Sequence, residues 1–392
     1  MSRAGKIGLI LGLLAAIVLL AGGCGSGFYS GDLKDLELVR GLIIDISENK
    51  GNMGENGENN EKKNGAVQNR DKSGAAGAAG EKELAVTALL LARDKALEGQ
   101  YADSYYQVSG AGSSLAGAVG ELYRRGARRL NFSHCQVLLL GEEAAGLANW
   151  LDWAQRSPEI RPTVYPVICR GRGQELTLGE GDISPLYWLH NILEPQGSSR
   201  PGPVAVRLQE FAELLLEPGA APVLPLVELA GGEVRLAGFV VYGGERPAGS
   251  LAGDEGLGWL LLMRQDYLAG EVLDLAGQAA LAIEAAAIGH EVRDGAPGPE
   301  VEYRLKLRLR TLENGENLTE AELAALAEER LQEIFAAAVA RSRELGLDYL
   351  GAGREIRRRE PELWPELAAL GPEGYLQKIK FRLVTELVVE DR

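Results

Sequence analysis

The sequence predicts a mixed α/β (α+β) protein of three domains, the last of which is an antiparallel sheet packed by a long helix. Two patterns indicate this fold class. Short apolar runs typical of buried strands alternate with helical segments over the first half of the chain. Toward the end, a strand of alternating apolar and polar residues is followed by one long, capped helix. Apolar residues make up 46% of the 392 residues, enough for a substantial core.

The charge and composition exclude several classes of protein. The chain has 56 acidic and 41 basic residues and a net charge of −15. Nucleic-acid phosphates require a basic surface, so no nucleic-acid partner is expected. Three cysteines and three histidines are too few for a disulfide scaffold or a histidine-rich metal site. We therefore expect an acidic protein without a metal or other cofactor.

Residues 1–23 have the layout of a lipoprotein signal peptide. Arg3 and Lys6 form a basic start, and residues 7–21 are uncharged and mostly apolar. Two glycines then precede Cys24, an arrangement that resembles the bacterial lipobox, in which the cysteine is acylated and becomes the new N-terminus. An uncleaved membrane anchor is the alternative, although the apolar part is short for a span of ~20 residues. We expect Cys24 to carry the lipid that holds the chain on a membrane.

Residues 24–195 are expected to form an N-terminal α/β domain. Residues 41–46 and 84–91 are apolar runs typical of buried strands. Between them, residues 47–82 contain no Leu, Ile, Phe, Tyr or Trp, so we expect a disordered insertion. Further strands are expected at 105–108, 135–140 and 163–169, and helices at 113–123 and 144–154.

Residues 196–265 are expected to form a middle domain. It begins with a linker rich in Gly, Pro and Ser, and a helix is expected at 204–216. A strand at 223–229 and a second strand that ends at a Gly-Gly turn then predict a hairpin.

Residues 266–392 are expected to form the C-terminal domain. Residues 301–310 alternate apolar and basic side chains, as a half-buried antiparallel strand does. Thr319 and Glu322 have the spacing of a capping box, and Gly346 is a typical helix stop. Residues 279–288 fit either a helix or a strand, because their alanines favour the first and their alternation favours the second.

No residue pattern indicates catalysis. His134 and Cys135 are adjacent, but neighbours on a strand point to opposite faces, so we interpret them as a hydrogen-bonded histidine and a buried thiol. Cys135 and Cys169 are expected to be free core thiols, and a disulfide between them is the alternative. Residues 110–112 are interpreted as a glycine turn, because the third glycine of a dinucleotide-binding loop is missing. The chain is therefore expected not to be an enzyme.

Two groups of charged residues remain to be interpreted. Residues 354–360 form a basic cluster, which we interpret as a solvated surface; contact with lipid headgroups or an acidic subunit is the alternative. Glu142 is expected to form buried ion pairs with Arg156 and Arg161, and contact with a partner is the alternative.

Several segments together resemble the Ger(x)C spore germination lipoproteins, the C subunits of nutrient germinant receptors. Residues 132–143 look like the family's histidine-containing strand that ends in Gly-Glu-Glu, and residues 156–161 like its Arg-Asp-Pro-Glu-Ile-Arg element. Residues 237–242 are similar to its middle hairpin, and residues 347–351 to the segment after its long helix. The segments occur in the family's order over nearly the whole chain.

The positions that carry this resemblance are interpreted as structural or partner-contact residues. They are Asp45, His134, Glu142, Arg156, Arg161, Gly238, Tyr349, Gly351, Arg354, Pro361 and Trp364. At the lipidation site the sequence departs from the family, which commonly has Cys-Trp-Asp, because Gly25 and Ser26 follow Cys24.

The resemblance implies a non-catalytic, lipid-anchored receptor subunit. It places the chain on the outer face of the spore inner membrane, beside integral-membrane subunits of the A and B types. It implies no enzymatic activity and no cofactor. The alternative is a lipid-anchored solute-binding protein that holds the nutrient itself, although only 6% of the residues are aromatic and no segment indicates a polar ligand cleft.

Replacing the lipidated cysteine tests the interpretation of the N-terminus. In Cys24→Ala the acyl chains cannot be attached, and we expect the protein to leave the membrane fraction. Cell fractionation followed by immunoblotting measures this loss against the unchanged chain. A variant that stays tightly membrane-bound would mean that residues 7–21 are an uncleaved anchor.

Overall fold

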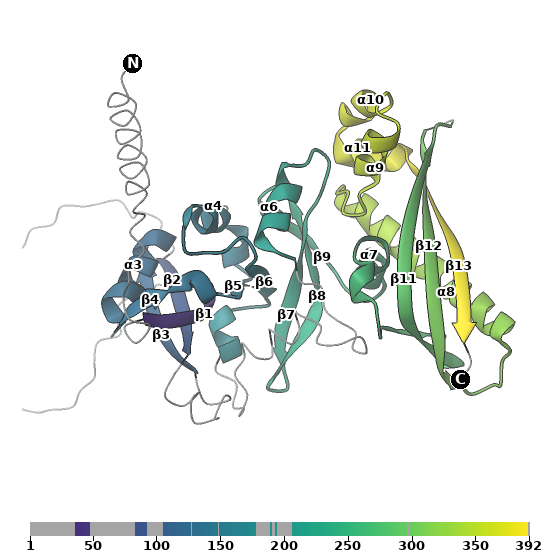
Figure 1. Cartoon of the computed structure of the whole chain (residues 1–392). Helices are drawn as coiled ribbons and strands as arrows, with labels where there is room; N and C mark the ends of the chain where they lie inside the picture. The colour runs from purple at the N-terminus through teal and green to yellow at the C-terminus, as the bar shows by residue number, and fades with distance from the viewer. Residues whose placement is uncertain are drawn as a thin grey trace, which may run out of the picture.

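The chain folds around two β-sheets that stand side by side, each with helices packed against it (Figure 1). The computed structural model describes residues 36–47, 83–91, 105–126, 128–147, 149–177, 189, 193, 206–295 and 298–390. The expected signal peptide, the lipidation site Cys24, residues 48–82 of the expected insertion and the expected linker lie outside the described residues. None of the described helices is both long and apolar enough to cross a membrane.

The first sheet has nine strands. They are β1 (Leu36–Ser47), β2 (Glu83–Leu91), β3 (Tyr105–Gly112), β4 (Arg129–Asn131), β5 (Val137–Gly141), β6 (Tyr165–Cys169), β7 (Val223–Ala230), β8 (Glu233–Gly243) and β9 (Arg246–Leu251). The order is β3-β2-β1-β5-β6-β7-β8-β9, and β4 pairs with β1. The neighbours β1, β5, β6 and β7 run parallel, and the outer strands are antiparallel. Every residue of β5 and β6 is buried, as is usual for central parallel strands.

Three helices cover one face of this sheet: α3 (Leu115–Arg125), α4 (Asn149–Arg156) and α6 (Leu208–Leu216). Leu42 and Ile44 of β1 share a buried apolar cluster with these helices. The intervening Ile43 belongs to a second cluster on the opposite face. This alternation is the two-residue period of a strand covered on both sides. Ser114 caps α3, since its hydroxyl oxygen accepts from the Gly117 N–H at 3.1 Å.

Two sequence-based element boundaries in this part are wrong. The strand expected from residue 135 starts only at Val137, as β5, and the residues just before Cys135 form a 3-10 turn, η2 (Phe132–His134). The side chain of Asn131 holds that turn by accepting from the Ser133 N–H at 2.9 Å. The helix expected over 144–154 is divided into the turn η3 (Ala144–Gly146) and α4, because Gly146 is a poor helix former.

The expected glycine turn at residues 110–112 is also wrong. Gly110 and Gly112 lie inside β3, where α3 crosses the strand closely. A Cβ atom on Gly110 would lie 2.4 Å from the carbonyl oxygen of Ala118, and a Cβ atom on Gly112 would lie 2.8 Å from the amide nitrogen of Ala118. These glycines therefore allow close helix–strand packing.

The predicted hairpin is confirmed and extends the first sheet. Strand β7 pairs with β6 in parallel at Ile168–Leu226 and Cys169–Val227, and β8 and β9 follow. Gly238 lies in β8 with a φ of 136°, where a Cβ atom would be 2.2 Å from the carbonyl oxygen of Leu251. The sheet thus runs from the expected N-terminal domain into the expected middle domain, and the three-domain division stays a prediction.

The second sheet has four strands: β10 (Val272–Asp274), β11 (Ala279–Arg293), β12 (Glu300–Asn314) and β13 (Lys380–Glu390). The ambiguous segment 279–288 is therefore a strand. The predicted antiparallel arrangement holds for β10, β11 and β12, but β13 runs parallel to β12. The reason is the long connection between them. A helical crossover returns the chain to the end of the sheet at which β12 starts, so β13 runs in the same direction as β12.

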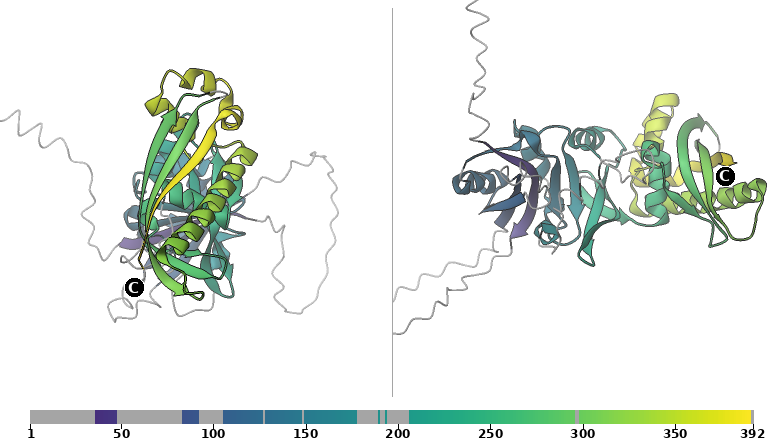
Figure 2. Two further views of the ribbon diagram at one scale, coloured as in Figure 1. Left: turned by 90° about the vertical axis from the view of Figure 1, so that its right-hand side faces the viewer. Right: turned by 60° about the horizontal axis from the view of Figure 1, so that its bottom comes forward.

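Helix α8 (Glu320–Leu345) forms most of this crossover and covers one face of the second sheet, as predicted (Figure 2). Its capping box is confirmed, because Thr319 and Glu322 each accept from the other's backbone N–H. Gly346 ends the helix with a φ of 64°. Helix α7 (Asp254–Met263) packs on α8 so closely that a Cβ atom on Gly258 would lie 2.6 Å from that of Ala338.

Three short helices follow α8 and gather at one end of the second sheet (Figure 1). They are α9 (Ala352–Arg359), α10 (Trp364–Ala368) and α11 (Gly371–Lys378). The loop between α6 and β7 contacts the segment just before these helices. The Ala221 N–H of this loop donates to the Asp348 carbonyl oxygen at 3.2 Å.

Removing the cap of α8 should measure how much the helix start contributes to stability. In Thr319→Ala the Glu322 N–H loses its side-chain acceptor, and we expect the free energy of unfolding to fall by about 1 kcal/mol. Chemical denaturation gives this value, and Thr163→Ala, at an exposed position, is the matched control. Equal stability of the two variants would contradict a contribution from the cap.

Candidate functional site

The described residues of the family resemblance fall into two clusters and a set of surface positions. Asp45 is the centre of the first cluster, in the first sheet. Asp348, which the resemblance included only as part of a segment, is the centre of the second cluster, where the two sheets meet. Neither cluster contains a group of histidine, cysteine and acidic residues that could hold a metal ion, within the part of the chain that the structure describes.

Asp45 is a buried carboxylate that holds a loop onto the first sheet. It is 3% exposed, and its two oxygens accept from the backbone N–H groups of Gly173 at 2.7 Å and Gln174 at 2.9 Å. Burial raises the pKa of Asp45, and the two N–H groups act against that shift. A Cβ atom on Gly141 would lie 2.1 Å from the Asp45 carboxylate, so the neighbouring strand must have glycine there. This arrangement fixes the loop after β6 and leaves no open face for a substrate.

The expected buried pairs of Glu142 with Arg156 and Arg161 are wrong, because all three residues are exposed. The carboxylate of Glu142 accepts from the Gly171 N–H at 3.1 Å, next to the Asp45 cluster. Arg156 pairs with Asp152 one helical turn earlier, at 2.7 Å. The Glu142 carboxylate is therefore hydrogen-bonded to a backbone loop and does not form the expected pairs with Arg156 and Arg161.

His134 and Cys135 do not lie on the expected strand and do not form a reactive pair. His134 is exposed at the end of η2, where partial desolvation and the charges of Arg161 and Arg40 lower its pKa. Cys135 is buried, its thiol donates to the Val137 carbonyl oxygen at 3.4 Å, and burial raises its pKa to about 12.

Cys169 is also buried, with a pKa raised to about 12 mainly by desolvation. Both cysteines are free thiols. A thiol with a raised pKa forms little of the thiolate that reacts as a nucleophile at neutral pH.

The second cluster is built around Asp348, which is 2% exposed. Its carboxylate accepts from the N–H groups of Ala352 at 3.0 Å and Gly353 at 2.6 Å and so caps the start of α9. The hydroxyl of Tyr375 in α11 lies 3.0 Å from the same carboxylate and 3.1 Å from the carbonyl oxygen of Gly219. Burial raises the pKa of Asp348, and these donors act against the shift.

The residues that follow Asp348 in the sequence are also fixed by hydrogen bonds. Tyr349 is buried and donates to the Ala338 carbonyl oxygen of α8 at 2.6 Å. The Leu350 carbonyl oxygen accepts from Tyr303 of β12 at 3.0 Å. Gly351 has a φ of 74°, which favours glycine at this turn into α9.

The aromatic residue of the motif packs beside the same cluster. Trp364 lies edge-to-face on Tyr375 with ring centroids 5.7 Å apart. A Cβ atom on Gly353 would lie 2.9 Å from both side chains, so α9 can pass only with glycine there. Pro361 is exposed. Tyr349, Gly351 and Trp364 therefore pack or hydrogen-bond within the chain, and their interpretation as structural or partner-contact residues stays a prediction.

The basic cluster at residues 354–360 is largely neutralised inside the chain. Arg357 pairs with Glu217 at the end of α6 at 2.6 Å, which links the first sheet to α9. Arg358 and Arg359 pair with the buried carboxylate of Glu355 at 2.6 and 3.1 Å. Burial raises the pKa of Glu355, but these two hydrogen bonds outweigh it and leave the pKa lowered.

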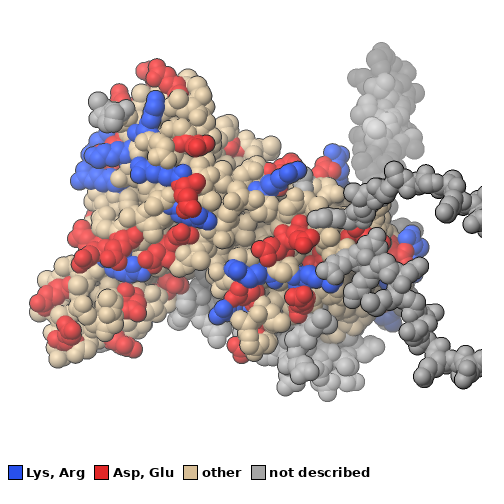
Figure 3. Space-filling model, turned by 180° about the vertical axis from the view of Figure 1, so that it is seen from behind, with Lys and Arg blue, Asp and Glu red and all other residues tan. Residues whose placement is uncertain are grey.

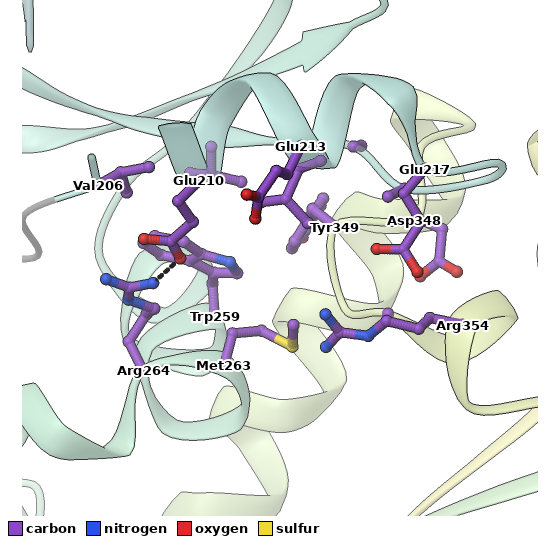
Figure 4. Close-up of a pocket in the computed structure, with 15 residues that line it drawn as sticks. Val206, Glu210, Glu213, Glu217, Trp259, Met263, Arg264, Asp348, Tyr349 and Arg354 are labelled. Atoms are coloured by element: carbon purple, nitrogen blue, oxygen red, sulfur yellow. Dashed lines mark hydrogen bonds and ion pairs between the residues drawn. The ribbon is translucent and has the colours of Figure 1, made fainter. Parts of the chain in front are cut away.

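A cavity of about 290 Å³ opens beside the Asp348 cluster (Figure 4). We call it the junction pocket, because its walls come from α6, from α7 and from residues 348–354. Its lining comprises Val206, Glu210, Glu213, Leu214, Glu217, Ala220, Ala221, Val223, Trp259, Met263, Arg264, Asp348, Tyr349, Gly351 and Arg354. Of the residues predicted from the family resemblance, the fold thus brings Tyr349, Gly351 and Arg354 to one site.

Most of this lining was not predictable from the sequence. Its one visible signal is the row Glu210, Glu213 and Glu217, which the spacing of three and four residues places on one face of a helix. No comparable spacing pattern marks Trp259 or Arg264. These residues reach the pocket from α7 and from the residue that ends α7, which are distant from α6 in the sequence.

The fold of this chain resembles that of a solved protein structure. It matches a solved structure described as the crystal structure of the GerBC protein, with a TM-score of 0.52 and 14% sequence identity, over 82% of this chain and 99% of that one. At this identity the match shows a shared fold.

Two family models then cover most of the sequence. The model for the spore germination protein N-terminal domain matches residues 30–229. The model described as spore germination B3/GerAC like, C-terminal, matches residues 237–382. The chain therefore belongs to the GerAC-type family of spore germination proteins, which confirms the resemblance found in the sequence. A search of curated proteins finds no match.

Removing the Tyr375 hydroxyl should weaken the junction between the sheets. In Tyr375→Phe the buried Asp348 carboxylate loses one donor, and we expect the free energy of unfolding to fall by about 1–3 kcal/mol. Urea denaturation measures the change. Tyr123→Phe is the matched control: the residue is 43% exposed and its hydroxyl makes an exposed 3.5 Å contact with Glu159, so its loss should change stability by less than about 0.5 kcal/mol. Equal losses in the two variants would contradict the role of this hydrogen bond.

Proposed function

We propose that this protein is a lipid-anchored, non-catalytic subunit of a spore nutrient germinant receptor, needed for receptor assembly or signal coupling. The observation that carries the proposal is the family match, which includes an N-terminal and a C-terminal germination model in one chain. The partners in this proposal are integral-membrane subunits of the A and B types.

The side chains of the described residues support a non-catalytic role. The two most buried motif carboxylates, Asp45 and Asp348, accept backbone hydrogen bonds and hold loops and helices together. Cys135 and Cys169 are buried thiols with raised pKa values. The surroundings of these carboxylates and thiols favour structural roles over action as a base or nucleophile.

The proposed membrane attachment depends on Cys24 and its lipid. The net charge of −15 disfavours attraction to anionic headgroups, and the basic residues 357–359 are paired with Glu217 and Glu355. Figure 3 shows acidic and basic side chains interspersed over one face of the molecule. The lipid would therefore supply most of the binding energy, and the folded body would be free to contact the other subunits.

A gene deletion combined with affinity purification tests this function. Spores that lack the protein should fail to germinate with the cognate nutrient and should still respond to treatments that bypass receptors. The tagged protein should co-purify the membrane subunits. Normal nutrient germination without the protein, in a strain with no paralogue, would overturn the proposal.

Complementation with a His134 variant tests the non-catalytic part separately. His134 is exposed and lies away from the buried clusters, so His134→Gln should restore germination to the wild-type rate. Complementation with the wild-type gene is the control. A folded and assembled His134→Gln protein that supports no germination would point to chemistry at this residue.

A further inference from the structure

Four arginines gather on the surface of the first sheet, at the end of α3 and at the start of β4. They are Arg124, Arg125, Arg128 and Arg129, and all four are exposed. The side chains of Arg124, Arg125 and Arg129 are 70, 59 and 49% accessible to solvent. We call these four residues the arginine patch. Its positive charge contrasts with the net charge of −15 of the whole chain.

The surface carboxylates close to the arginine patch neutralise it only in part. Glu121 pairs with Arg124 at 2.6 Å and with Arg125 at 3.0 Å, and Glu159 lies 3.8 Å from Arg129. Exposed ion pairs of this kind are weak and are screened by salt. The guanidinium groups can therefore exchange these carboxylates for other anions.

The arginine patch lies beside the first described residue of the chain. Strand β4 pairs with the start of β1, and Arg129 is the register partner of Leu36. Adjacent strands are ~4.8 Å apart, so the patch lies next to the point from which the chain continues toward its expected lipid. Eleven residues separate Leu36 from the expected lipidation site Cys24, and a chain of that length reaches at most about 40 Å.

The position of the arginine patch in the fold also favours contact with a membrane. Figure 1 shows α3, β4 and β1 together at the end of the first sheet that is far from the second sheet. Glu37, the residue after Leu36, is 8% exposed, and when it is counted with Glu121 and Glu159 the patch has four positive and three negative charges. The part of the body nearest to the expected lipid is therefore positive in an otherwise acidic protein.

An exposed aromatic side chain adjoins the arginine patch. Tyr123 is 43% exposed, and its ring packs edge-to-face on Phe132 with centroids 5.9 Å apart. Tyrosine is enriched where proteins meet the headgroup layer of a membrane, because its ring is apolar and its hydroxyl is polar. Arginine and tyrosine together are therefore a suitable combination for a surface that rests on headgroups.

We propose that the arginine patch rests on the anionic headgroups of the membrane and orients the first sheet toward it. Lipid phosphate oxygens accept hydrogen bonds from the guanidinium groups, whose planar shape matches a phosphate. The second sheet, at the far end of the molecule, then projects away from the membrane. The inference rests on the lipid anchor of the proposed function and deepens it, because the anchor alone fixes no orientation.

The net negative charge of the chain is compatible with this contact. Charges are screened over ~8 Å at physiological ionic strength, so acidic residues far from the patch repel the membrane only weakly. The lipid supplies the attachment itself, and a tethered surface has a high effective concentration at the membrane. A patch with a small positive charge can therefore set the orientation, although it would not hold the protein on the membrane alone.

Chemical modification of the lipidated full-length protein tests this contact. The protein is reconstituted into phosphatidylcholine vesicles with or without phosphatidylglycerol, and mass spectrometry follows the reaction of each arginine with phenylglyoxal. We expect the four patch arginines to react about fivefold more slowly on the anionic vesicles, and this protection to disappear at high salt. The internal controls are four exposed arginines elsewhere, which should react equally on both vesicles: Arg170, Arg235, Arg246 and Arg308.

The result also separates this inference from the proposed function. Protein that does not float with neutral vesicles would contradict the lipid anchor, and this inference with it. Protein that floats, but whose patch and control arginines react alike on anionic vesicles, would overturn this inference alone. Protection that appears only in membranes containing the other receptor subunits would assign the patch to a protein partner and would overturn the contact with lipid.

A charge variant locates the contact independently. On anionic vesicles we expect Tyr123 to be protected from hydroxyl-radical oxidation, and the quadruple variant Arg124→Gln, Arg125→Gln, Arg128→Gln and Arg129→Gln should lose this protection. The matched control changes the net charge equally and should keep the protection; it carries Arg170→Gln, Arg235→Gln, Arg246→Gln and Arg308→Gln. Protection of Tyr123 that persists in the folded patch variant, or is lost equally in both variants, would overturn the proposal.

A smaller variant keeps the test decisive if the quadruple patch variant does not fold. Arg125 donates to the Ser109 carbonyl oxygen at 3.0 Å, so its loss can weaken the contact between α3 and β3. The double variant Arg124→Gln and Arg128→Gln leaves that hydrogen bond in place and should still reduce the protection of Tyr123. Thermal unfolding without vesicles verifies that each variant is folded, and unchanged protection in the folded double variant would count against the proposal.

Discussion

The junction of the two sheets depends on the burial of one carboxylate, that of Asp348. A buried carboxylate is costly unless hydrogen-bond donors surround it. Here the donors come from the start of α9 and from Tyr375 of α11, and the Tyr375 hydroxyl also lies against Gly219 from the first sheet. Because one side chain ties these segments together, the positions of α9, of Arg354 and of the junction pocket wall all follow from it.

Asp45 satisfies the same constraint in the first sheet. There the donors are the N–H groups of Gly173 and Gln174, and Gly141 provides the space. Both acidic residues belong to segments that resemble a protein family, and both are engaged by backbone groups. A family resemblance at a buried Asp therefore indicates a requirement of folding here.

The candidate site was only partly predictable. Tyr349, Gly351 and Arg354 were identified through the family resemblance, and the structure brings them to one pocket. Glu213 and Trp259 were not identified, since they lie on different helices, α6 and α7, and the spacing of residues along one helix does not specify what that helix faces. The expected pairing of Glu142 with Arg156 and Arg161 was wrong for the same reason: an ion pair depends on geometry that residue types alone do not specify.

The sequence by itself determined the features that depend on neighbouring residues. The capping box of Thr319 and Glu322, the stop at Gly346, the alternation along β12 and the hairpin of β8 and β9 all result from interactions within a few residues of the chain. Only the tertiary structure decided the parallel pairing of β13 with β12, the extension of the first sheet from β6 to β7, and the ion pair between Arg357 and Glu217. These contacts join segments far apart in the sequence, so their formation depends on how whole elements pack, and the local pattern of residues does not contain that information.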